Sequence, residues 1–279
     1  MPVSSLKLEG DSLARFSLNS GSIKAPLEDL ITAGASAGFG WIELWSRDFS
    51  ADRSPQSIAG LLRAKQMKVS AFQLLRDFEG APTSLRADRF AEAERLFGQM
   101  SEIGADLLLV CANTAADCSG DRTTIARDLR QLADMAQARN MRISLEPLAW
   151  SRWMNTYEQA LACVEHVNHP ALGLTIDMFH WFWGGTPVAF IDQVPMARCF
   201  GVQLCDAAPA GLSAIETARK HRLFPGQGSW PVADLAARIR KAGYTGFYNL
   251  EVFNVDYLDM SATDFVAMAT SSIASIWND

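Results

Sequence analysis

Short apolar runs, rich in branched side chains, alternate with longer amphipathic stretches along the whole chain. An apolar run bounded by turn residues is typical of a strand that is buried on both faces of a parallel sheet. The clearest example ends in a carboxylate and is followed closely by a histidine. We expect strands near Arg15–Leu18, Gly40–Leu44, Lys68–Leu75, Asp106–Ala112, Arg142–Pro147, Leu172–Asp177, Gly201–Leu204 and Phe247–Val252.

The stretches between these runs carry apolar residues at helical spacing. The predicted helices are Pro26–Ala37, Pro55–Lys65, Ser84–Gly104, Asp121–Arg139, Tyr157–Val167, Pro187–Val194, Pro231–Ala242 and Ala262–Trp277. Eight strands, each followed by a helix, predict an α/β fold, a single (β/α)8 TIM barrel that forms one domain over residues 1–279. The alternative is a doubly wound open sheet, but no Gly-rich phosphate-binding loop opens a helix here.

The composition is that of an ordinary globular protein, with 49% hydrophobic and 20% charged residues. A net charge of −6 argues against nucleic-acid binding, which usually needs a basic surface. No apolar run reaches membrane-spanning length, and residues 1–10 lack the basic and apolar regions of a secretory signal. The five cysteines show no CxxC spacing, which indicates free thiols in a reducing compartment. We therefore expect a soluble cytoplasmic protein without nucleic-acid or membrane partners, and a homo-oligomer is left open.

Four of the predicted strands end in side chains that offer oxygen atoms, namely Glu146, Asp177, Gln203 and Glu251. In a TIM barrel these strand ends meet at one face, so the four side chains would converge. Three carboxylates brought together repel one another unless a cation neutralises them. An oxygen-rich set without thiolates suits one divalent ion such as Mg²⁺, Mn²⁺ or Co²⁺, and Zn²⁺ less well. Each residue alone could be a solvated strand end, but the four together favour a metal site.

His180 follows Asp177 by three positions, which would place its imidazole beside the metal. A neutral imidazole there could act as a base toward the substrate, or it could hold a metal ligand in place. His166 and His169, by contrast, are expected at the surface.

Arg222 is the main candidate for binding an anionic substrate. Its planar guanidinium suits a carboxylate or a phosphate, and Lys220 lies two positions before it. The loop that follows contains Gly226 and Gly228, which would let the backbone turn tightly near a ligand. The alternative is that this basic cluster is simply solvated.

Other residues near the predicted barrel mouth are weaker candidates for substrate contacts. Arg76, just past the third strand, could bind an anion or pair with neighbouring carboxylates. Glu43, on the second strand, could orient groups in the mouth. Aromatic walls at the mouth would exclude water, and five tryptophans lie near predicted strand ends: Trp45, Trp150, Trp153, Trp181 and Trp183.

The chain resembles the xylose-isomerase-like barrel superfamily of sugar phosphate isomerases and epimerases over essentially its whole length. The resemblance rests on Asp177-Met178-Phe179-His180 and on the set Glu146, Asp177, Gln203 and Glu251. Many sugar epimerases of this group have His where this chain has Gln203, whereas metal-dependent bacterial 3-dehydroshikimate dehydratases are similar in having Gln there. The stretches 72–80 and 221–228 are similar to the same dehydratases.

The resemblance implies a divalent-metal-dependent lyase that dehydrates 3-dehydroshikimate to protocatechuate through a metal-stabilised enolate, with His180, Glu146 or Glu251 as the base. Its substrate would be small, polyhydroxylated and anionic. One alternative is a ketosugar or ketosugar-phosphate isomerase or epimerase, in which Glu146 and Glu251 carry the protons. Another is an inosose dehydratase, which needs no carboxylate clamp.

Two further classes are disfavoured by the residues themselves. A DNA-repair endonuclease built on this barrel would use more histidine ligands and a basic face, whereas the chain has four histidines and a negative net charge. A non-catalytic sugar-binding barrel would not need three clustered carboxylates.

Overall fold

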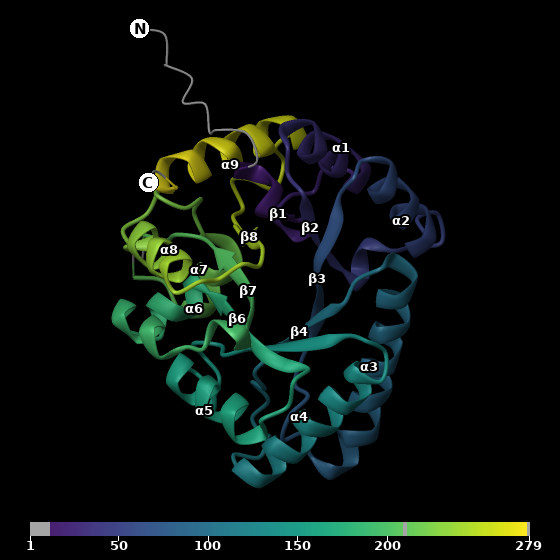
Figure 1. Ribbon diagram of the computed structural model, residues 1–279, viewed down its shortest axis with the longest axis vertical. Helices are drawn as coiled ribbons and strands as arrows, with labels where there is room; N and C mark the ends of the chain where they lie inside the picture. The colour runs from purple at the N-terminus through teal and green to yellow at the C-terminus, as the bar shows by residue number, and fades with distance from the viewer. Residues whose placement is uncertain (1–11, 209–210, 278–279) are drawn as a thin grey trace, which may run out of the picture.

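Eight parallel strands form a closed barrel at the centre of the molecule (Figure 1). The computed structural model describes residues 12–208 and 211–277, so the expectation about residues 1–10 and the outermost ends of the predicted domain lie outside the described part. Each strand pairs with the next, and β1 pairs with β8 to close the ring. The strands are β1 (Phe16–Asn19), β2 (Trp41–Trp45), β3 (Lys68–Leu75), β4 (Leu107–Cys111), β5 (Arg142–Glu146), β6 (Leu172–Asp177), β7 (Cys199–Leu204) and β8 (Tyr248–Leu250). The predicted TIM barrel is confirmed.

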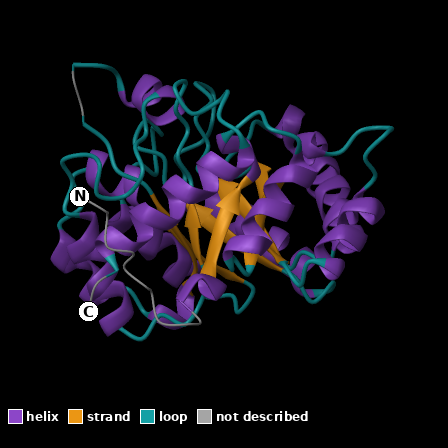
Figure 2. Cartoon of the chain, turned by 90° about the horizontal axis from the view of Figure 1, so that it is seen from above, coloured by secondary structure: helices purple, strands orange, loops and turns teal. Residues whose placement is uncertain are grey.

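Helices cover the outside of the barrel (Figures 1 and 2). Those that follow the amphipathic pattern are α1 (Leu27–Ala37), α2 (Pro55–Ala64), α3 (Thr83–Ile103), α4 (Arg122–Gln137), α5 (Tyr157–Val167), α8 (Val232–Lys241) and α9 (Ala262–Ile276). Helix α4 shows the principle, because Leu129 and Leu132 are fully buried while Asp121 caps its first turn by accepting from the Thr124 N–H at 2.9 Å. No helix in the described part of the chain is long and apolar enough to cross a membrane.

The pattern did not predict two short helices, α6 (Met178–Trp183) and α7 (Ala214–Lys220). Helix α6 reads MFHWFW, whose aromatic residues occupy consecutive positions, so no amphipathic period marks it. It starts directly after β6 because the Asp177 carboxylate accepts a hydrogen bond from the Phe179 N–H at 2.8 Å. The helix predicted at Pro187–Val194 is instead a 3₁₀ helix over Val188–Gln193.

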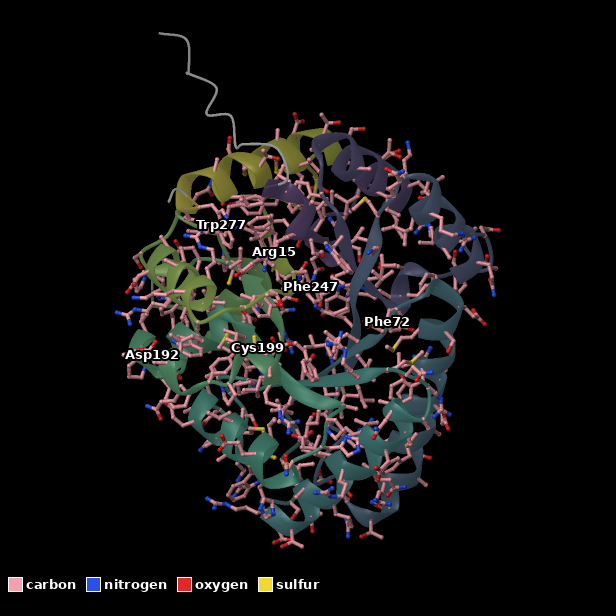
Figure 3. All side chains as sticks on the ribbon, in the orientation of Figure 1. Arg15, Phe72, Asp192, Cys199, Phe247 and Trp277 are labelled. Atoms are coloured by element: carbon pink, nitrogen blue, oxygen red, sulfur yellow. The ribbon has the colours of Figure 1, made fainter. Side chains whose placement is uncertain are left out.

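The two ends of the barrel differ in chemistry. Where the strands begin, Phe247 packs on Trp41 with ring centroids 5.8 Å apart and joins a small apolar cluster. Apolar side chains such as Phe72 fill the space around the strands (Figure 3). Where the strands end, buried carboxylates including Glu146 and Asp177 take their place. The polar end is therefore the one that can hold a site.

His169 does not lie at the surface as expected. It is buried, and both ring nitrogens have partners there. Its Nδ1 accepts from the Ala171 N–H at 3.1 Å, and its Nε2 lies 3.1 Å from Asp134 Oδ1. These contacts tie α4 to the turn before β6. His166 is exposed, as expected.

Candidate metal and substrate site

A cavity of about 320 Å³ opens at the carboxyl ends of the strands. Figure 2 shows the strand arrows pointing toward the side of the molecule where the long loops gather. The cavity is lined by five of the predicted catalytic, metal-binding and substrate-binding residues: Arg76, Glu146, His180, Arg222 and Glu251. A larger cavity of about 960 Å³ lies at the opposite end of the barrel, but none of the predicted site residues lines it. The smaller cavity is therefore the one with the relevant chemistry.

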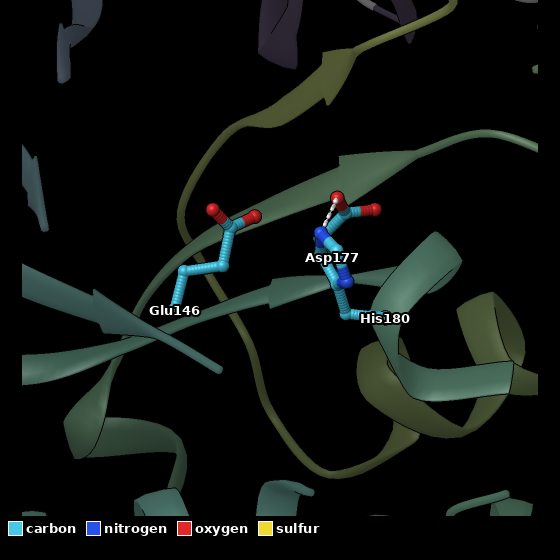
Figure 4. A group of neighbouring side chains, drawn as sticks. All are labelled: Glu146, Asp177 and His180. Atoms are coloured by element: carbon cyan, nitrogen blue, oxygen red, sulfur yellow. Dashed lines mark ion pairs between the residues drawn. The ribbon is translucent and has the colours of Figure 1, made fainter. Parts of the chain in front are cut away.

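Glu146, Asp177 and His180 form the densest cluster of potential metal ligands in the described residues (Figure 4). One donor atom from each lies within 4.8 Å of the other two. Glu146 is the last residue of β5, Asp177 is the last residue of β6, and His180 lies on the first turn of α6. The imidazole Nε2 is 3.6 Å from Asp177 Oδ2 (dashed in Figure 4). Two neighbouring strand ends thus bring these groups together.

The other two predicted ligands join this cluster from the adjacent strands. The Gln203 side chain donates from Nε2 to Glu251 Oε1 at 3.1 Å. Gln203 Oε1 and Glu146 Oε1 are both buried and have no hydrogen-bond partner among the described residues. A buried oxygen without a partner is costly unless something else binds it. Two such oxygens beside a group of carboxylates fit a divalent cation.

Arg222 supplies the one positive charge that touches the cluster within the described part of the chain. Its Nη1 donates to Asp177 Oδ2 at 2.9 Å and to Glu251 Oε2 at 3.0 Å. The guanidinium is buried against the rings of Phe179 and Phe253. Burial acts to lower the pKa of Arg222, but the charges of Asp177 and Glu251 outweigh it and raise that pKa. Arg222 therefore stays charged and contacts two predicted metal ligands as well as lining the cavity.

One guanidinium does not balance the carboxylates. Burial, with Asp177 adding repulsion, raises the pKa of Glu146 well above its usual range. Burial also raises the pKa of Glu251 to about 7, although Arg222 opposes this. Burial and the charge of Glu251 raise the pKa of Glu43 to about 8. Burial is the largest cause of these raised pKa values, and repulsion between carboxylates adds to it; a bound cation would lower all three pKa values.

The hydrogen bonds of His180 define which nitrogen carries its proton. Its Nδ1 accepts from the Ala149 N–H at 3.0 Å, and burial lowers the pKa of the imidazole to about 4. The ring is therefore neutral, with its proton on Nε2. In this arrangement Nε2 is a hydrogen-bond donor toward the cavity, and the ring packs against Trp150 with centroids 4.9 Å apart.

The other three residues predicted to contact substrate differ in how far they lie from the cavity. Arg76 is exposed and lines the cavity. Lys220 is exposed and does not line it, whereas the neighbouring Arg219 does. Glu43 is 1% exposed and lies inside the barrel, bonded to side-chain amides rather than facing the cavity.

The loop glycines serve a different purpose from the one expected. The N–H groups of Gly226 and Gly228 donate to Asp206 Oδ2 at 3.2 and 3.0 Å. A Cβ on Gly228 would come within 2.2 Å of Asp206 Oδ1. These glycines allow the loop to close on a buried carboxylate of the protein itself.

Sequence reasoning missed the amides and the thiol that support the cluster. Gln73 Nε2 donates to Glu251 Oε1 at 2.6 Å, and Asn19 Nδ2 donates to the same oxygen at 3.2 Å. The Cys111 thiol donates to Glu146 Oε2 at 3.0 Å. Cys111 and Asn19 are the last residues of their strands, as Glu146 and Asp177 are, so the same strand-end signal could have found them.

Among the tryptophans, Trp45 and Trp150 line the cavity. Trp181 is fully buried behind it against Tyr157, and Trp183 stacks on Phe179. Trp153 is 43% exposed and lies outside the cavity wall. The aromatic wall is thus formed by two of the five.

The sequence of this chain is similar to those of several known enzymes. The chain is 39% identical over 84% of its length to a 3-dehydroshikimate dehydratase of Pseudomonas aeruginosa, and 38% identical over the same share to one of Pseudomonas putida. It spans only 37% of the length of these two relatives. It is 24% identical over 53% of its length to an inosose isomerase of Halalkalibacterium halodurans, covering 52% of that protein.

Solved structures share the fold. A xylose isomerase-like TIM barrel/4-hydroxyphenylpyruvate dioxygenase fusion protein superimposes with a TM-score of 0.88 at 34% identity, over 93% of this chain and 42% of that one. The IOLI protein with a bound zinc atom superimposes with a TM-score of 0.85 at 19% identity, over 94% of this chain and 97% of that one. Residues 31–270 match the family described as Xylose isomerase-like TIM barrel, to which this chain therefore belongs.

Proposed function

We propose that this chain is a divalent-metal-dependent dehydratase that converts 3-dehydroshikimate to protocatechuate. The observation that carries the proposal is the buried cluster of Glu146, Asp177 and Glu251 with Arg222 at the floor of a cavity. The likeness to two Pseudomonas 3-dehydroshikimate dehydratases supports this reading. Because those relatives are much longer, the activity of the isolated barrel is itself part of the proposal.

The metal would be held by Glu146, Asp177, Gln203 and Glu251, with Gln203 contributing its partnerless Oε1. When bound, it supplies Lewis-acid polarisation of the substrate ketone and so favours loss of the neighbouring proton. The oxygen-rich set favours Mg²⁺, Mn²⁺ or Co²⁺. The IOLI protein, which shares this fold, was solved with a bound zinc atom, and this supports a divalent ion as the cofactor.

We assign a separate role in the reaction to each of the acidic and basic side chains in the cavity. The base that removes the α-proton is Glu146 or Glu251, because both carboxylates line the cavity. His180 was expected as a base, but its Nδ1 is occupied and its Nε2 carries a proton. We assign it the role of a hydrogen-bond donor that holds the departing β-hydroxyl, while the glutamate that took the α-proton returns it to this hydroxyl, which leaves as water. Loss of the α-proton and the hydroxyl, followed by enolisation, gives the aromatic ring.

Arg222 would bind the substrate carboxylate. Its Nη1 and Nε are taken by protein acceptors, while its Nη2 makes no hydrogen bond with the described residues and the side chain lines the cavity. Arg76 at the rim adds a second positive charge. An anionic ring would thus place its carboxylate on the guanidinium, next to the carboxylate cluster.

The second candidate is isomerisation or epimerisation of a ketosugar. It is favoured by the likeness to inosose isomerases and by the presence of two glutamates, Glu146 and Glu251, at the cavity floor. Both reactions begin with removal of an α-proton. They differ in whether a hydroxyl leaves.

The test uses metal-free protein mixed with 3-dehydroshikimate, with and without Mg²⁺, Mn²⁺ or Co²⁺, while ultraviolet absorbance follows the aromatic product. We expect metal-dependent product formation that is lost in Glu251→Gln and His180→Ala. Glu216→Gln, an exposed change on α7, is the matched control and should keep full activity. Absence of product in protein that binds a metal would refute the dehydratase proposal and bring forward the ketosugar reaction.

A further inference from the structure

We infer that Glu43 is a positioning residue that fixes which end of the Gln203 carboxamide faces the metal site. The inference rests on the proposed function, because it takes Gln203 as a metal ligand. Glu43 lies in the middle of β2, and its side chain is buried inside the barrel. It does not line the cavity, so it cannot contact a substrate there.

Both Glu43 oxygens are occupied by side-chain amides from three other strands. Asn19 Nδ2 donates to Glu43 Oε2 at 3.1 Å, and Asn249 Nδ2 donates to the same oxygen. Gln203 Nε2 lies 3.4 Å from each carboxylate oxygen. All three amides turn their nitrogens toward the Glu43 oxygens, which accept these hydrogen bonds.

Glu251 enforces the same orientation from its side. Its Oε1 accepts from Gln203 Nε2 at 3.1 Å, so the two N–H groups of Gln203 face two carboxylates. The opposite end of the amide, Oε1, is left buried without a partner among the described residues. A flipped amide would put Oε1 against both carboxylates and turn its N–H groups toward the cation, where they would repel it.

Glu43 therefore acts on the metal through Gln203 and not by direct contact. Partners that orient metal ligands typically change metal affinity about 10–100-fold when they are removed. The test titrates metal-free protein with Mn²⁺ by calorimetry, with no substrate present. We expect Glu43→Gln to weaken Mn²⁺ binding by about 10–100-fold. The KM for 3-dehydroshikimate at saturating Mn²⁺ should stay unchanged.

A double-mutant cycle separates positioning from a simple loss of charge. In a Gln203→Ala background, Glu43→Gln should cause no further loss of Mn²⁺ affinity, because there is no amide left to orient. Equal losses in both backgrounds would overturn the inference, since they would mean that Glu43 acts by its charge alone. Wild-type affinity in Glu43→Gln would overturn it as well.

Two further variants keep the test secure. Glu43→Asp keeps the charge but withdraws it from Gln203, so it should lose affinity like Glu43→Gln, even if the latter folds poorly. Glu79→Gln changes another buried carboxylate that makes no contact with Gln203, and it should bind Mn²⁺ like the wild type. Because binding is measured without turnover, failure of the dehydratase assay would leave this result standing, and the reverse also holds.

Discussion

At the residue scale, the main feature is a fixed positive charge inside a site that also suits a metal. Arg222 donates hydrogen bonds to Asp177 Oδ2 and to Glu251 Oε2. The other oxygen of each carboxylate accepts a hydrogen bond elsewhere, Asp177 Oδ1 from the Phe179 N–H and Glu251 Oε1 from Gln73 Nε2. The guanidinium thus stabilises the carboxylates in the absence of a metal. It also repels an incoming cation.

Arg222→Met removes this charge at similar volume. We expect the metal-free protein to lose about 3–5 kcal/mol of unfolding free energy, because two buried carboxylates lose their partner. We expect tighter Mn²⁺ binding and loss of protocatechuate binding. Thermal unfolding with and without Mn²⁺ measures the first two effects, and calorimetry measures the third. Arg219→Met, an exposed neighbour, should leave unfolding unchanged.

Glu79 gives a pH prediction that does not involve the metal. Burial raises its pKa to about 7 from 4.5. Between these values the unfolded chain has lost the proton and the folded chain has kept it, so the free energy of unfolding falls as pH rises and levels off above about 7. The free energy of unfolding that is lost in this way amounts to about 3 kcal/mol above pH 7.

Glu79→Gln should therefore flatten the decline in unfolding free energy of the metal-free protein between pH 5 and pH 8. Glu43 and Glu251 also have raised pKa values, so part of the decline should remain. Denaturant titrations at four pH values measure the slope. An unchanged slope in Glu79→Gln would mean that this carboxyl titrates normally in the folded protein.

At the element scale, hydrophobic periodicity located the strands well. Strands β3 and β6 agree with the predicted bounds at both ends, since an apolar run between polar turns leaves little freedom. Helix α6 was missed because its start is set by a single cap, Asp177, and its sequence has no polar face. Such elements depend on tertiary burial, which periodicity does not report.

The loop after α7 yields a prediction at the same scale. Asp206 accepts N–H bonds from Gly226, Gly228 and Trp230, so it anchors the loop. Gly228→Ala would force a Cβ into this carboxylate and should cost about 1–3 kcal/mol of unfolding free energy. Gly98→Ala, where nothing lies within 4 Å of the new Cβ, should be neutral or slightly stabilising in the same denaturant titration.

At the scale of the whole molecule, the barrel explains how much of the site was predictable. Strand-end carboxylates could be grouped from the sequence because the fold brings all strand ends together. The pairing of Arg222 with Asp177, and the amide contacts of Glu43, could not be predicted. They depend on the depth and direction of side chains inside the barrel, which strand assignment alone leaves open.

A metal that binds only the folded barrel should stabilise the whole molecule. At a free Mn²⁺ concentration 100 times its Kd, we expect about 2.7 kcal/mol of added unfolding free energy. This corresponds to a rise in Tm of about 5–10 °C. A chelator should reverse the rise, and Glu146→Gln should diminish it. An unchanged Tm over the full titration would contradict the metal site.

The proposed ligands and the side chains that orient them lie in different halves of the barrel. The proposed ligands lie on β5 to β8 or just after them, whereas Asn19, Glu43 and Gln73, which hold two of those ligands in place, lie on β1 to β3. In the proposed site neither half of the barrel is thus sufficient, because β5 to β8 supply the ligands and β1 to β3 supply side chains that orient them. If Glu43, Asn19 and Gln73 orient the proposed ligands, we expect substitutions in β1 to β3 to change metal affinity during evolution while every ligand stays the same.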